Sequence, residues 1–143
     1  MRTPRDTTAL GIALLRVTLG VMFIAHALLK IVVFTLPGTA AFFESVGLPG
    51  SLAYVVTPLE LFGGVALVFG LKTRWVSLAL VPVLIGAATV HAGNGWVFSA
   101  PNGGWEYPVY LAIAAIAQAL LGSGAVALDN PRPDQHPLVG QTA

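Results

Sequence analysis

One stretch decides the fold class: Ser51 to Gly70, which reads SLAYVVTPLELFGGVALVFG. It is apolar except for Glu60 near its middle, and it is long enough to cross a bilayer, which takes about 20 helical residues. An acidic side chain at the centre of such a helix costs roughly 2.5–3.5 kcal/mol. Residues of this kind usually face a protein interior, have a partner and mark a functional site. Glu60 is therefore the first candidate functional residue.

The rest of the chain has the same apolar character. Of its 143 residues, 56% are hydrophobic and 9% are charged, whereas soluble domains carry about 25% charged residues. These apolar runs are too long for membrane-spanning strands and lack their alternation. The sequence therefore predicts an all-α protein, a four-transmembrane-helix bundle. The expected spans are approximately Thr8–Lys30, Ser51–Gly70, Trp75–Ala92 and Trp105–Leu121.

The segments outside the spans complete the predicted organisation. Residues 1–7 are expected to form a cytoplasmic lead, 8–124 the four-helix membrane domain, and 125–143 a flexible cytoplasmic tail. The segment from Thr39 to Val46 is short and amphipathic, with two phenylalanines beside a glutamate. It predicts an interfacial helix in the first outer loop.

Basic residues predict the orientation of the spans, because loops rich in Lys and Arg stay in the cytoplasm. With four spans, one side of the membrane carries Arg2, Arg5, Lys72, Arg74 and Arg132. Both termini are therefore expected to be cytoplasmic. The net charge of +1 gives no sign of nucleic-acid binding. The absence of cysteine excludes thiol–disulfide exchange, thiolate metal sites and iron–sulfur ligation through this chain.

Arg16 interrupts the first apolar stretch as Glu60 interrupts the second. Counting residues from the ends of the two antiparallel spans places both side chains near mid-membrane. Because a guanidinium stays charged and its planar fork suits a carboxylate, we expect an Arg16–Glu60 ion pair. This pair could bind or protonate a ligand, or it could only lock the register of the helices.

A second layer of polar residues is expected near the outer surface, where it would ring a vestibule above this pair. Arg16, His26 and Lys30 share one face of a helical wheel, so that face should point into the bundle. Lys30 could instead snorkel to the interface, and the outermost residues could have no task. The candidate pocket and proton-linked residues are Arg16, His26, Lys30, Glu60, His91 and Glu106. No catalytic residue is assigned.

No metal site and no intrinsic cofactor are expected. The histidines and carboxylates do not show the Glu-x-x-His or His-x-x-x-His spacing of helical metal ligands. A haem between His26 and His91 is geometrically conceivable, since both lie near the outer end, but no haem motif accompanies them.

Several short motifs occur in a characteristic order along the chain. They are Arg16-Val17-Thr18-Leu19-Gly20, Glu60-Leu61-Phe62-Gly63-Gly64, Gly70-Leu71-Lys72-Thr73-Arg74 and Gly103-Gly104-Trp105-Glu106-Tyr107. With these motifs the chain resembles the DoxX family, within the DoxX/DoxD-like small bacterial membrane proteins, over roughly Leu10 to Asp129. One departure is Ala27, where the family often has a glycine after the histidine.

The resemblance implies a four-helix bundle in the bacterial cytoplasmic (inner) membrane. Some relatives look like subunits of quinone-linked oxidoreductases, including thiosulfate:quinone oxidoreductase, and others are similar to components of oxidative-stress complexes. We therefore expect an accessory subunit of a membrane redox, quinone-linked or oxidative-stress complex, with a quinone as the candidate ligand of its polar pocket. Whether the chain is itself part of an enzyme stays open.

Two alternatives remain. The chain could be a non-enzymatic membrane scaffold or assembly factor, or, with less support, a small-solute or proton transporter. Besides the lipid bilayer, the expected partners are other membrane or redox proteins or further copies of the chain.

Overall fold

The computed structural model describes residues 4–129, and every regular element in this range is a helix. The predicted all-α fold class is therefore confirmed. In chain order the elements are α1 (Pro4–Leu28), the π-helical turn η1 (Leu29–Val33), α2 (Leu36–Ser45), η2 (Gly50–Leu52), α3 (Ala53–Phe69), α4 (Thr73–His91), η3 (Ala92–Asn94) and α5 (Glu106–Leu121).

Three of these helical stretches are long and apolar enough to cross a membrane. They are Thr7–Val33, Gly50–Phe69 and Thr73–Asn94, with 27, 20 and 22 residues. The first extends beyond the predicted end at Lys30, because η1 continues α1 without a break. The fourth apolar helix, α5, has 16 residues, which corresponds to about 24 Å.

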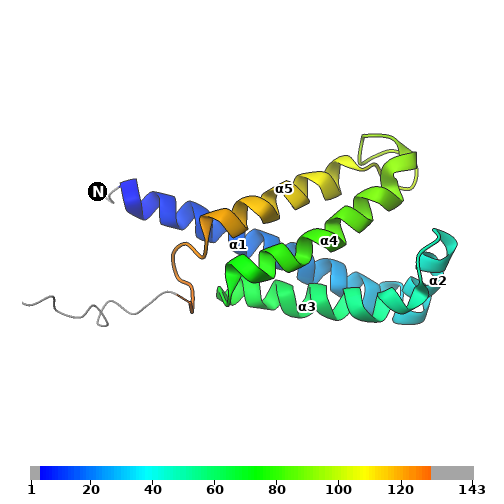
Figure 1. Ribbon diagram of the computed structural model, residues 1–143, viewed down its shortest axis with the longest axis horizontal. Coiled ribbons are helices and arrows are strands. Elements are labelled where there is room, and N and C mark those ends of the chain that lie inside the picture. Colours follow the sequence, from blue (N-terminus) through cyan, green and yellow to red (C-terminus); the bar gives the residue numbers. More distant parts are fainter. Residues whose placement is uncertain (1–3, 130–143) are drawn as a thin grey trace, which may run out of the picture.

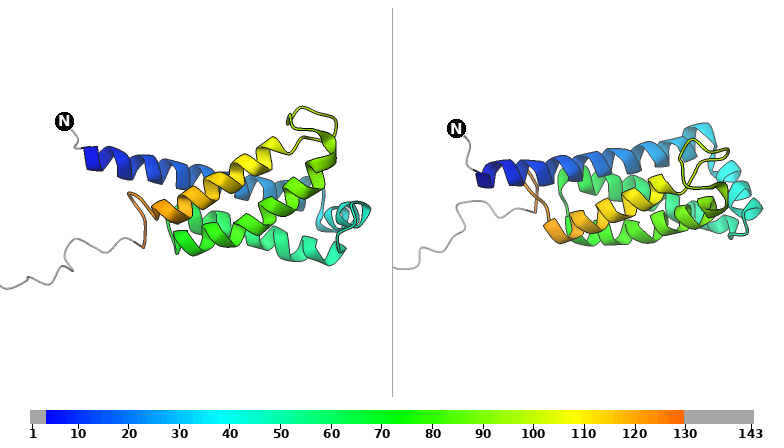
Figure 2. Two further views of the ribbon diagram at one scale, coloured as in Figure 1. Left: turned by 45° about the horizontal axis from the view of Figure 1, so that its top comes forward. Right: turned by 90° about the horizontal axis from the view of Figure 1, so that it is seen from above.

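The helices form two antiparallel pairs, α1 with α3 and α4 with α5, and a tight turn joins α3 to α4. Gly70 ends α3 with a φ of 71°, a left-handed conformation that glycine adopts without a steric penalty. Buried Leu19, Leu67 and Leu80 fill the core. Toward the end that carries α2, the α4–α5 pair diverges from α1 and α3 (Figure 1 and the left view of Figure 2).

Two glycines fix how α1 and α3 lie against each other. A Cβ atom on Gly20 would lie 2.7 Å from the carbonyl oxygen of Gly64, and one on Gly64 equally close to that of Gly20. Small residues allow this close approach of helix backbones. Since the two helices are antiparallel, Arg16 then lies level with Val68, and Glu60 lies level with Ile24.

After α5 the chain turns back across the ends of α1 and α3. We call residues 124–129 the C-terminal strap. The amide of Ala125 donates to the carbonyl of Ala9 (2.9 Å), and that of Leu128 donates to Phe69 (3.1 Å). The carboxylate of Asp129 accepts from the amide of Thr73 (3.3 Å) at the start of α4. Contacts of the helical unit thus continue into the segment expected to be a flexible tail, whose remainder, 130–143, lies outside the described residues.

The loop between the first two spans does contain a helix, α2, which begins at Leu36, before the predicted start at Thr39. Thr35 caps it by accepting a hydrogen bond from the amide of Gly38 (3.2 Å). Phe42 and Phe43 lie on α2 near the ends of α1 and α3. This helix therefore becomes a wall of the site described next.

Candidate functional site

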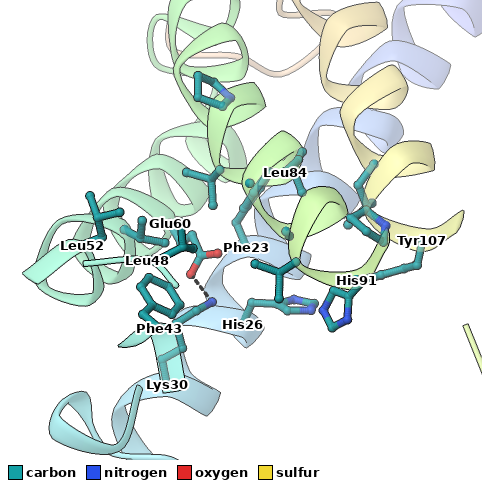
Figure 3. A pocket seen from close by; sticks show the side chains of 18 of the residues that line it. Phe23, His26, Lys30, Phe43, Leu48, Leu52, Glu60, Leu84, His91 and Tyr107 are labelled. Carbon is teal, nitrogen blue, oxygen red and sulfur yellow. Dashed lines mark hydrogen bonds and ion pairs between the residues drawn. The ribbon is translucent and has the colours of Figure 1, made fainter. Parts of the chain in front are cut away.

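A cavity of about 440 Å³ lies between the diverging helix pairs and α2. Side chains from α1, η1, α2, α3, α4 and α5 line it, and most are apolar. The apolar side chains include Phe23, Phe43, Leu48, Leu52, Leu84 and Leu111. Ligand pockets in proteins usually have 300–1,000 Å³ and a few polar groups in an apolar wall. This cavity has both properties (Figure 3).

An ion pair between η1 and α3 is the most polar part of the cavity. Lys30 Nζ donates to Glu60 Oε2 over 2.7 Å, and the two side chains are 17% and 6% exposed. Lys30 thus points inward and does not snorkel away from the bundle. It lies in the π-helical turn, a distortion that often occurs at functional sites.

The predicted Arg16–Glu60 ion pair is wrong. Arg16 Nη1 donates to the carbonyls of Leu67 (2.8 Å) and Val68 (3.0 Å). The reason is depth: Arg16 lies level with the C-terminal end of α3, about 12 Å along the helix axis from the level of Glu60. Helix α1 begins at Pro4 and extends past the C-terminal end of α3 at Phe69, so counting from Thr8 placed Arg16 too close to the middle of the bundle.

Arg16 is buried, with 1% exposure, and it joins two separate segments. Its Nη2 donates to the strap carbonyls of Ala125 (3.2 Å) and Val126 (3.0 Å), while Nη1 binds the last turn of α3. A cation is favourable there, because the C-terminal end of a helix carries a partial negative charge. Arg16 therefore holds the strap against α3 and lies outside the cavity.

Two histidines line the cavity beside the ion pair. His26 Nδ1 lies 2.8 Å from the carbonyl oxygen of Met22. Because a carbonyl can only accept, Nδ1 carries the hydrogen and Nε2 is left for a ligand. The His26 ring stacks on Tyr107, with centroids 6.1 Å apart. Figure 3 shows His26 and His91 next to each other, between the ion pair and Tyr107.

Glu106 is not among the residues that line the cavity. Its Oε1 accepts a hydrogen bond from the amide of Phe98 (2.9 Å), and its own amide donates to Trp96 (3.0 Å). It therefore closes the loop between η3 and α5. The next residue, Tyr107, faces the cavity instead, since adjacent helical residues point about 100° apart.

The structure thus brings together four of the predicted residues, His26, Lys30, Glu60 and His91, and places Arg16 and Glu106 elsewhere. Phe43 and Leu48, from the loop between the first two spans, and Tyr107 of α5 were not predicted from the sequence as site residues. The amphipathic pattern around Phe43 was a usable signal, although it was assigned to the membrane surface. Among residues 4–129, no three His, Asp or Glu side chains are grouped as metal ligands.

The DoxX family model matches residues 11–92 of this sequence, more than half of the chain. The chain belongs to the DoxX family. Among DoxX-related proteins, it is 40% identical over 121 residues to "Putative oxidoreductase CatD" of Bacillus subtilis (strain 168), covering 84% of this chain and 85% of that protein. No solved structure matches the chain significantly.

In this DoxX protein the matched region holds most of α1 and all of η1 through α4, and thus Lys30, Glu60, His26 and His91. The cavity combines an ammonium, a carboxylate and two imidazoles with an apolar wall. The ammonium can donate hydrogen bonds to ligand oxygens, and the imidazoles and the carboxylate can exchange protons with a ligand.

Proposed function

We propose that this protein is an accessory subunit of a membrane redox complex and binds a quinone head group in the cavity. The observation that carries the proposal is the Lys30–Glu60 pair beside two imidazoles in a largely apolar cavity. A quinone has an apolar ring and two carbonyl oxygens that only accept hydrogen bonds. It therefore needs an apolar wall and a few donors.

Reduction of a quinone to its hydroquinone takes up two electrons and two protons. An ammonium has three donors, of which Lys30 uses one toward Glu60. The others can bind a carbonyl oxygen and stabilise the negative charge that it gains on reduction. Imidazole side chains often act as general acids and bases, so His26 and His91 are suited to supply the protons, His26 from a protonated Nε2. The electrons would come from a partner subunit.

The proposal includes a topology of four spans in the bacterial inner membrane, with both termini in the cytoplasm. Although α5 is short, it runs antiparallel to α4, and about 24 Å suffices where the bilayer thins locally. Lys72 and Arg74 lie at the α3–α4 turn, at the same end as the start of α1 and the strap. Basic residues at this end agree with a cytoplasmic location. The Bacillus subtilis relative is named a putative oxidoreductase, which also agrees with a redox role.

The experiment is quinone binding to the purified full chain in lipid nanodiscs, by titration with a water-soluble quinone without a tail. We expect Glu60→Gln and Lys30→Met to weaken binding by roughly tenfold or more, as loss of a charged hydrogen bond does. Glu106→Gln is the matched control, because it keeps an acceptor for Phe98 outside the cavity. Binding that is absent, or equal in all variants, would contradict the proposal and favour the scaffold function.

A further inference from the structure

A second cavity, of about 410 Å³, lies between η1 and α2. It shares His26, Lys30, Phe42 and Phe43 with the main cavity. Both spaces therefore adjoin these four residues, among them Phe42 and Phe43, whose ring centroids lie 6.3 Å apart. A ligand that binds beside Lys30 can therefore extend from there into either cavity.

We propose that the second cavity holds the apolar tail of the ligand, so that the natural ligand is a lipid-soluble quinone with a prenyl or alkyl tail. The identity of the head group rests on the function proposed above, whereas the tail site follows from the second cavity. The quinone ring would lie beside Lys30 in the main cavity, and the tail would pass Phe42 and Phe43 between η1 and α2.

The lining of the second cavity suits a hydrocarbon chain. Beyond the four shared residues it consists of Leu29, Phe34, Gly38 and Thr39. The hydroxyl of Thr39 is already used, because it donates to the carbonyl of Thr35 (2.9 Å). A ligand segment in this space thus meets mainly carbon atoms, and burying a hydrocarbon tail there is favourable.

The rim of the second cavity carries exposed apolar side chains. Leu29 is 42% and Phe34 is 58% exposed. Leu29 lies inside the membrane-span candidate Thr7–Val33, and Phe34 directly follows it. Exposed apolar side chains at the end of a span face acyl chains, so a tail leaving between them enters the bilayer without contact with water.

Two features of α2 keep this passage open. Gly38 has no side chain. A Cβ atom there would lie 3.3 Å from Thr35 Oγ1, a tight contact from which the threonine side chain must move slightly, and no other atom is close, so a larger side chain would project into the cavity. Thr35, which precedes α2, has φ 61° and ψ 156°, a region that is nearly exclusive to glycine. Its hydrogen bonds with Gly38 and Thr39 hold this backbone and with it the position of α2.

The test compares two quinones with the same ring, one without a tail and one with two prenyl units, on the full chain in nanodiscs. Redox-inert dimethyl ethers of the corresponding hydroquinones serve as a parallel pair. For the wild type we expect the tail to tighten binding by roughly tenfold or more. Gly38→Leu should abolish this gain and leave binding of the tail-less quinone unchanged, because only the tail cavity is filled.

Gly11→Leu is the matched control, since it is the same substitution at an open position of α1, away from both cavities. It also corrects for partition of the tailed probe into lipid, which is equal for all variants. If Gly38→Leu disturbs α2, Leu29→Trp provides a second test of the tail site, because it narrows the rim of the cavity from η1.

The outcomes separate the two proposals. The tail site is overturned if the tail increases affinity equally in the wild type, Gly38→Leu and Leu29→Trp. It is also overturned if the tail does not increase affinity in either probe series. Both conclusions hold even if binding of the tail-less quinone depends on Glu60. A different outcome is that the tailed quinone and the tailed ether bind equally well, that Gly38→Leu removes the gain in affinity from the tail, and that Glu60→Gln has no effect. This outcome would support the tail site and contradict the quinone head-group site.

Discussion

Lys30 and Glu60 meet across the cavity with 2.7 Å between Nζ and Oε2, although thirty positions separate them in the chain. Lys30 comes from the π-helical end of the first helix and Glu60 from the middle of α3. The lysine offsets the free-energy cost of placing a carboxylate in an apolar helix. The pair also places a cation where a ligand oxygen can reach it. It is thus both a structural contact and the centre of the proposed site.

The ion pair predicts a non-additive response to mutation. Glu60→Met or Lys30→Met alone leaves one charge without its partner, and we expect each to lower the free energy of unfolding by about 3 kcal/mol. The double variant removes both charges and should be closer to the wild type than either single variant. Equilibrium unfolding in mild detergent measures the difference. Additive losses would show that the two charges do not interact.

Arg16 predicts a local effect at the strap. Arg16→Lys keeps the charge but replaces the planar fork, which bridges α3 and the strap, by a single ammonium. We expect faster amide hydrogen exchange at Ala125 and Leu128, because release of the strap frees their hydrogen bonds. Quinone binding should stay unchanged. A loss of binding with an intact strap would place Arg16 back in the site.

The Gly20–Gly64 contact predicts opposite effects of one substitution at two positions of α1. Gly20→Ala puts a methyl group 2.7 Å from the Gly64 carbonyl oxygen, and the backbone cannot yield without separating the helices. We expect a loss of about 1–3 kcal/mol in unfolding free energy. Gly11→Ala meets nothing within 4 Å and should be neutral or stabilising by up to about 1 kcal/mol. The two unfolding midpoints, measured in the same detergent, test this contrast.

We expect substitution of Glu106 to affect only the loop between η3 and α5. Glu106→Ala removes the acceptor of the Phe98 amide, so hydrogen exchange at Phe98 should accelerate. Glu106→Gln retains an acceptor and should exchange nearly as slowly as the wild type. Quinone affinity is expected to be equal in all three proteins. Weaker binding in both variants would mean that the carboxylate acts in the cavity after all.

The fold class could be predicted because apolar runs interrupted by turns leave few options in a membrane. Polar residues in or beside such runs are energetically costly, which made it possible to predict His26, Lys30, Glu60 and His91 as site residues. The pairing of Glu60 could not be predicted, since it depends on where α1 ends and how far it slides along α3. The π-helical turn at Lys30 has no clear sequence signal.

By itself, the sequence determined that this chain forms apolar helices and that a few buried polar side chains must find partners. Only the tertiary structure decided which partners these are. The Gly20–Gly64 contact sets the position of α1 along α3. In this position Glu60 is within reach of the Lys30 side chain, and Arg16 binds the carbonyls at the end of α3. Hydrophobicity is a local property of the chain, whereas an ion pair requires that the charged ends of two distant side chains reach each other.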